Sequence, residues 1–262
     1  MTTYEAAILD VDGTIVRGER LLEGATQGLR SLEDAGLSRL LFSNNPTRGA
    51  AHYRERVGNH GIEIGPENVL TSATVTAEYL ASTHDGDAVY LVGEDRLAAI
   101  VREAGLEVTT DPTAADLVVG SIDRAFTYDN LGAALEALER DVPFYGTDPD
   151  VTIPTDDGTM PGSGAVLAAM AAVAGREPDA ILGKPSSIAA EAAMARLEVD
   201  PADTLVVGDR LDTDVALGQR AGMTTALVLT GVTTRADLER SEIEPAYVLE
   251  SLGEVDSILD GE

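Results

Sequence analysis

The sequence predicts an α/β protein built on a doubly wound parallel sheet, and three observations lead to that fold class. Short apolar runs typical of strands alternate with helix-length segments along the whole chain. Single helices separate successive strands, which is the order that a parallel sheet requires. Polar residues and glycine follow several of the apolar runs, and ligands bind beyond the carboxyl ends of strands in such sheets.

The expected elements divide into an outer set and a middle set. In the outer set we expect strands over 6–9, 39–42, 204–207 and 225–229, with helices over 24–35, 47–57, 72–82 and 213–221. The middle has its own alternation, with elements over 88–92, 99–104, 117–119, 131–139 and 143–145, and then a turn-rich stretch, 155–162, before a helix over 165–174. The 262 residues are enough for two domains. We therefore expect a core domain over 1–84 plus 181–262 and an inserted α/β cap domain over 85–180.

Composition excludes several kinds of site. The chain has no cysteine, so disulfides, thiolate zinc sites and cysteine nucleophiles are excluded. His52, His60 and His84 do not fall at metal-ligand spacing within one helix, which argues against a histidine metal site or a Ser-His-Asp triad. The N-terminus has no signal-peptide pattern, and the longest apolar run, 165–174, is too short to cross a bilayer. We expect a cytoplasmic protein with no membrane partner.

The net charge of −28 is spread over the whole chain rather than gathered in one acidic tail. This distribution argues against a nucleic-acid partner, because nucleic-acid binding needs a basic surface. Dispersed acidity with almost no lysine resembles proteins of salt-loving archaea, in which salt screens the self-repulsion. We therefore expect a halophilic archaeal source.

The segment Asp10-Val11-Asp12-Gly13-Thr14 directly follows the first apolar strand. Asp10 and Asp12 can divide labour in phosphoryl transfer, with one carboxylate attacking phosphorus and the other protonating the leaving oxygen and later activating water. The alternative is a loop with two solvated aspartates, but the position straight after the strand favours chemistry.

Three further segments hold candidate ligands at the ends of expected strands or the starts of expected helices. Ser43 and Asn44 follow the second strand and offer a hydroxyl, an amide and backbone N–H groups to a phosphate, although Ser43 could also cap a helix. Asp209 and Asp214 offer oxygen ligands to Mg²⁺, and acids there also suit the start of a helix. Lys184 is the only lysine in the chain, and an ammonium suits a phosphate oxygen or a carboxylate nucleophile, unless this lysine remains by chance.

Together these segments resemble the haloacid dehalogenase superfamily of phosphatases, in the order and with the wide separations of its four motifs. Within it, the stretches 43–48, 69–72, 147–150 and 161–164 resemble the NagD-like branch of nitrophenylphosphatases and nucleotide monophosphatases, which carries an α/β cap between its second and third motifs. Asp148 stands where asparagine is expected in that branch, and Ser43 stands where threonine is common.

The resemblance implies a Mg²⁺-dependent phosphatase that acts on small phosphorylated metabolites through an aspartyl-phosphate. Asp10 would be the nucleophile and Asp12 the general acid/base, while Ser43, Asn44 and Lys184 would bind the phosphoryl group. The metal would take Asp10, the Asp12 carbonyl and Asp209, with Asp214 in support. Nucleotide monophosphates and sugar phosphates are the expected substrates, with p-nitrophenyl phosphate accepted in vitro.

Two alternatives stay open at this point. A phosphoryl transferase or mutase of the same superfamily would use a sugar hydroxyl in place of water. A phospho-accepting receiver domain also combines aspartates, a hydroxyl and a lysine, but such domains are about half this length and do not need an acid/base at Asp12. The sequence leaves both the natural substrate and the oligomeric state open, a homo-oligomer included.

Overall fold

The computed structural model of the chain describes residues 4–155 and 158–259, which form two compact units. The first unit contains the residues up to Ser43, the segment Ala50–Leu70 and the residues from Ala189 onward. The second contains Asn44–Gly49 and Thr71–Ile188. The domain boundaries predicted from the sequence stay a prediction. Within the described ranges, no helix has both the length and the apolar character needed to span a membrane.

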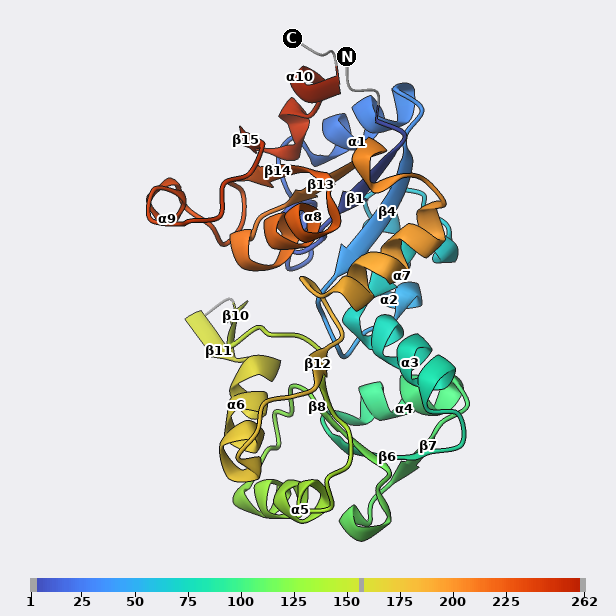
Figure 1. Cartoon of the computed structure of the whole chain (residues 1–262). Coiled ribbons are helices and arrows are strands. Elements are labelled where there is room, and N and C mark those ends of the chain that lie inside the picture. Colours follow the sequence, from blue (N-terminus) through green and yellow to red (C-terminus); the bar gives the residue numbers. More distant parts are fainter. Residues whose placement is uncertain (1–3, 156–157, 260–262) are drawn as a thin grey trace. The chain divides into compact units, whose positions relative to one another are not determined.

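The first unit is organised around a six-stranded sheet (Figure 1). Its strands lie in the order β15 (Tyr247–Leu249), β14 (Thr224–Val228), β13 (Thr204–Gly208), β1 (Ala6–Leu9), β4 (Ser38–Ser43) and β5 (Val69–Thr71). Strand β1 pairs in parallel with β13 and β4, so that Leu9 lies opposite both Val207 and Leu41. This register brings residues that follow three distant segments of the chain to one edge of the sheet.

Helices and short turns complete the first unit. The longer helices are α1 (Ala25–Asp34), α2 (Ala50–Gly58), α7 (Ser187–Leu197) and α8 (Ala216–Ala221), followed by the short α9 (Arg235–Leu238) and α10 (Asp256–Leu259). Alternate residues of β1 and β13, such as Leu9 and Val207, share one apolar cluster with Leu29 of α1 and Tyr53 of α2. All of β1 is buried, as an interior strand of a parallel sheet should be.

The second unit contains a five-stranded parallel sheet of its own. Its strands lie in the order β12 (Ala180–Ile181), β9 (Phe144–Gly146), β8 (Leu117–Gly120), β6 (Ala88–Val92) and β7 (Glu107–Thr109). The helices are α3 (Ser72–Thr83), α4 (Asp95–Glu103), α5 (Tyr128–Leu138) and α6 (Ser163–Ala174). Val118 packs in one cluster with residues of α5 and α6, whereas its neighbours Leu117 and Val119 pack with residues of α3 and α4. The strand's period of two therefore places helices on both faces.

The α/β fold class with parallel sheets is confirmed, and the differences concern local segments. Within the stretch 155–162, expected to be turn-rich, Thr155 ends β10 (Thr152–Thr155) and the residues from 158 on form β11 (Gly158–Pro161), which pairs with β10 in a hairpin. Residues 156–157 lie outside the described residues. The helix expected over 213–221 is preceded and partly replaced by a π-helical turn, Leu211–Val215. A second hairpin, β2 (Val16–Arg17) with β3 (Arg20–Leu21), escaped the sequence analysis because its strands are only two residues long.

Asp148, the residue that departs from the branch's asparagine, is buried just beyond β9 in the second unit. Thr147 Oγ1 donates to Asp148 Oδ2 at 3.0 Å, and the backbone N–H of Asp150 donates to Oδ1 at 3.3 Å. Burial raises the pKa of the Asp148 carboxyl to about 7, and repulsion from Asp150 adds to the rise. Hydrogen bonds from Ser163 and Thr147 oppose the rise without cancelling it.

We expect Asp148→Asn to stabilise the protein at pH 8 by several °C and to do so progressively less toward pH 5. A carboxyl whose pKa is raised in the folded state contributes stability that is fully present below its unfolded pKa and is lost as the pH rises through about 7. Asparagine carries no charge and escapes that loss, which amounts to ~1.4 kcal/mol per pKa unit. Thermal melts of both proteins at matched salt measure the difference at each pH.

The exposed Asp85→Asn, also in the second unit, serves as the control and should change the melting temperature equally at both pH values. A pH-independent difference between Asp148→Asn and the wild type would contradict the assignment of a neutral Asp148 in the folded protein.

Candidate active site

Three buried carboxylates meet at the edge of the sheet in the first unit. They belong to Asp10 after β1, Asp209 after β13 and Asp214 in the π-helical turn, and each offers a ligand oxygen within 4.8 Å of the others. Their exposed fractions are 8%, 1% and 2%. Three negative charges this close, and this far from water, repel one another unless positive charge lies between them. This acidic triad can hold a divalent metal ion.

Backbone groups hold the acidic triad in place. The N–H of Asp10 donates to the carbonyl of Val207 at 2.9 Å, which continues the pairing of β1 with β13. The backbone N–H of Val232 donates to Asp209 Oδ2 at 2.6 Å, and the N–H of Arg210 donates to Asp214 Oδ2 at 3.1 Å. The carboxylates of Asp209 and Asp214 are therefore oriented by the main chain, while strand pairing places the backbone of Asp10 beside β13.

Two glycines let neighbouring loops approach Asp209 closely. Gly13 has a φ of 101°, and a Cβ there would lie 2.4 Å from Asp209 Oδ2. A Cβ on Gly231 would lie 1.7 Å from the same oxygen. A side chain at either position would displace the carboxylate, so both loops need glycine for this site to form.

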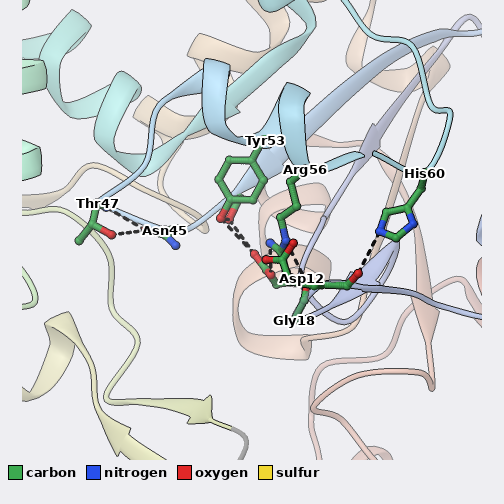
Figure 2. Close-up of polar contacts among 9 residues, drawn as sticks. Asp12, Gly18, Asn45, Thr47, Tyr53, Arg56 and His60 are labelled. Atoms are coloured by element: carbon green, nitrogen blue, oxygen red, sulfur yellow. Dashed lines mark hydrogen bonds and ion pairs between the residues drawn. The ribbon is translucent and has the colours of Figure 1, made fainter. Parts of the chain in front are cut away.

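Asp12, the predicted general acid/base, has a half-exposed side chain that contacts residues of β4 and α2 (Figure 2). Arg56 Nη1 donates to Asp12 Oδ1 at 2.6 Å, and the hydroxyl of Tyr53 donates to Oδ2 at 3.1 Å. Ser43, a predicted phosphate ligand, lies in the same group, because its Oγ is 2.8 Å from the Tyr53 hydroxyl and 3.4 Å from Asp12 Oδ2. The structure therefore brings Asp12 and Ser43 together.

Tyr53 and Arg56 were missed by the sequence analysis. They stand three residues apart, on one face of α2, and both are buried. The sequence shows only an arginine in the helix after the Ser43 strand, and its burial, which requires a partner for the charge, is visible only in the structure. The sequence pattern predicted a helix here, but it did not indicate which carboxylate the face with Tyr53 and Arg56 contacts.

Asn44 and Lys184 lie together in the second unit. Asn44 Nδ2 donates to the backbone carbonyl of Lys184 at 3.0 Å, and the backbone N–H of Lys184 donates to Asn44 Oδ1 at 2.8 Å. A Cβ on Gly183 would lie 2.6 Å from the carbonyl oxygen of Thr147, so glycine is needed beside this contact. The Asn44 amide thus holds the main chain of Lys184, which is itself only 2% exposed. Phosphate binding by Asn44 and Lys184 stays a prediction.

Comparison with known proteins supplies the family. A family model described as haloacid dehalogenase-like hydrolase matches residues 7–107, and one described as HAD-hydrolase-like matches residues 181–255. The chain is 35% identical to the 5′-nucleotidase YutF of Bacillus subtilis over 97% of this chain and 98% of that protein.

Solved structures agree with these matches. The p-nitrophenyl phosphatase from Archaeoglobus fulgidus superposes with a TM-score of 0.93 at 35% identity, covering 98% of this chain and all of that one. NagD from Escherichia coli K-12 superposes with a TM-score of 0.86 at 29% identity, covering 96% and 98% of the two chains. The two ranges matched by the family models contain Asp10 and Asp209, respectively. The chain therefore belongs to the haloacid dehalogenase-like hydrolases, in their NagD-like branch, and is a phosphoric monoester hydrolase.

Proposed function

We propose that this hydrolase removes phosphate from small phosphorylated metabolites through an aspartyl-phosphate on Asp10, with Mg²⁺ as its metal. The observation that carries the proposal is the buried triad of Asp10, Asp209 and Asp214, with a second carboxylate, Asp12, two residues beyond the first. Nucleotide monophosphates and sugar phosphates are the proposed substrate classes. The B. subtilis relative is named a 5′-nucleotidase, which supports the first of them.

The proposed reaction has two displacements at phosphorus. A carboxylate oxygen of Asp10 forms a bond to phosphorus while the bond to the leaving oxygen breaks, and the Asp12 carboxyl gives its proton to that oxygen. The Asp12 carboxylate then takes a proton from water as the water oxygen attacks phosphorus. The bond from Asp10 to phosphorus breaks, which releases inorganic phosphate and restores both aspartates to their starting states.

The residues of the triad suit Mg²⁺ because all of their ligand atoms are oxygens. Asp10, Asp209 and the backbone carbonyl of Asp12 would hold the ion, with Asp214 in support. When bound, the ion supplies positive charge that offsets repulsion between the carboxylate nucleophile and the phosphate dianion. The predicted role of Lys184 is a second positive charge for the phosphoryl group, with the Ser43 hydroxyl as an uncharged donor.

We expect Asp10→Asn to lose at least ~10³-fold in kcat, because an amide oxygen is a poor nucleophile for phosphorus. The matched control is Asp212→Asn, which alters an exposed carboxylate that pairs with Arg210 in the loop after β13. Phosphate release from p-nitrophenyl phosphate, measured beside circular dichroism of each variant, makes the comparison. A folded Asp10→Asn enzyme with a tenth of normal activity would rule out this nucleophile.

Activity should require Mg²⁺, and Ca²⁺ should replace it poorly, because Ca²⁺ takes more ligands at longer distances. Asp209→Asn should raise the Mg²⁺ concentration for half-maximal activity by at least ~10-fold, since one charged ligand is lost. Titrating Mg²⁺ into chelator-treated wild type and variant tests both points. Full activity of the wild type in excess chelator would contradict the metal site.

Lys184→Arg should be as damaging as Lys184→Met, with a loss of about 100-fold or more in kcat/KM. The side chain is buried and Asn44 holds its main chain, so a wider, forked guanidinium cannot take the place of the ammonium. Kinetics of both variants, with melting temperatures to check folding, separate a local role from a long-range one. Near-normal kinetics of the arginine variant would show that any cation suffices.

A further inference from the structure

We propose that Arg56 and Tyr53 are positioning residues that hold the Asp12 carboxyl in the orientation needed for proton transfer to the leaving group. The proposal rests on the general acid/base role proposed for Asp12. It adds two residues of α2 that the family motifs around Asp10, Ser43, Lys184 and Asp209 do not include. Neither residue is proposed to touch the substrate.

The guanidinium of Arg56 bridges Asp12 and the loop of the β2–β3 hairpin. Its Nη1 donates to Asp12 Oδ1 at 2.6 Å, and its Nε donates to the carbonyl oxygen of Gly18 at 3.0 Å. Nη2 donates to the same carbonyl. The side chain is only 9% exposed, so these acceptors replace most of the water that a guanidinium would otherwise bind. The rigid, planar guanidinium is thereby held in one orientation, and it holds the Asp12 carboxylate in turn.

Tyr53 fixes the second oxygen of the same carboxyl. It is fully buried, and burial raises the pKa of its hydroxyl well above the usual value, with the charge of Asp12 adding to the rise. The hydroxyl therefore keeps its proton and donates to Asp12 Oδ2 at 3.1 Å, while its oxygen is 2.8 Å from Ser43 Oγ. One hydroxyl thus orients the proposed acid/base and accepts from a proposed phosphate ligand.

The need for such contacts follows from the exposure of Asp12. Its side chain is 47% exposed, and it lies in a loop where packing alone does not select one rotamer. Two donors three residues apart on α2, one to each carboxylate oxygen, restrict it to one orientation. Because general acid catalysis contributes ~10²–10⁴-fold and depends on geometry, loss of either donor should slow the step that uses the proton.

The dependence of the reaction rate on the leaving group distinguishes this positioning role from a purely structural one. An alkoxide must be protonated as it leaves, whereas p-nitrophenolate is stable at neutral pH and departs without a proton. A defect in positioning Asp12 should therefore lower kcat/KM for alkyl phosphates and change it little for p-nitrophenyl phosphate, because kcat/KM reports the steps up to phosphoryl transfer. Hydrolysis of the aspartyl-phosphate, which also uses Asp12, is common to both substrates and affects only kcat. General damage to the fold or to the metal site would slow both substrates.

The experiment compares kcat and kcat/KM of Arg56→Met for ethyl phosphate and p-nitrophenyl phosphate at saturating Mg²⁺. We expect a loss of at least ~10-fold in kcat/KM with ethyl phosphate and less than ~3-fold with p-nitrophenyl phosphate, following the size of general acid effects. Arg56→Lys should recover part of the ethyl phosphate rate, because an ammonium can still reach one acceptor. Arg54→Met is the control, since Arg54 lies on the same helix and its Nε donates to the carbonyl of Ile64.

Tyr53→Phe provides the same readout if Arg56→Met fails to fold, because it keeps the ring and removes only the hydroxyl. Asp12→Asn tests the underlying role. If Asp12→Asn lowers kcat/KM equally for both substrates, the acid role of Asp12 is wrong. If Asp12→Asn lowers kcat/KM selectively for ethyl phosphate but the Arg56 and Tyr53 variants match Arg54→Met, or lower kcat/KM alike for both substrates, the positioning proposal is overturned while the proposed function stands.

Discussion

The central feature of the first unit is that three buried carboxylates, those of Asp10, Asp209 and Asp214, are held together at one edge of its sheet despite their mutual repulsion. Their ligand oxygens lie within 4.8 Å of one another and are shielded from water, an arrangement that costs free energy in the absence of a cation. Parallel pairing of β1 with β13 brings the first two together, and glycine at positions 13 and 231 lets the loops close around Asp209. The main chain is thus shaped to gather negative charge where a metal and a phosphate are expected.

Helix α2 places positive charge and hydrogen-bond donors beside this acidic site. Arg56 and Tyr53 donate to Asp12, whereas backbone N–H groups donate to Asp209 and Asp214 of the triad. The proposed acid/base, Asp12, is half-exposed and the proposed nucleophile, Asp10, is buried, although only one residue separates them. Such a difference between two carboxylates lets one act as a nucleophile while the other exchanges protons.

The second unit shows the same use of buried polar groups for orientation. Both the oxygen and the nitrogen of the Asn44 amide hydrogen-bond to the main chain of Lys184, so Asn44 supports the backbone of the other residue predicted to contact phosphate. Asp148 is surrounded by Thr147, Ser163 and the N–H of Asp150, yet burial dominates and favours its neutral form. A neutral aspartic acid is close in shape and polarity to the asparagine expected in this branch.

The local sequence pattern was enough to predict the helices and strands and the segments that hold the candidate site residues. The run Ala6–Leu9 is a strand with the predicted bounds, and Asp10 and Asp209 follow buried strands as expected, because apolar period and strand ends are properties of neighbouring residues. The salt-loving source, inferred from the dispersed acidic residues, stays a prediction. The short hairpin Val16–Leu21 was missed because two-residue strands carry no period.

Tertiary structure alone decided which side chains serve the predicted site. Arg56 contacts a carboxylate 44 residues away, and Asn44 holds a peptide 140 residues away. Such pairings depend on the register of strands and the rotation of a helix about its axis, which burial of the whole core selects. The sequence by itself determined the fold class, the family and the carboxylates at the strand ends. Which neighbours orient those groups was settled only by packing, because no local pattern encodes a contact between distant segments.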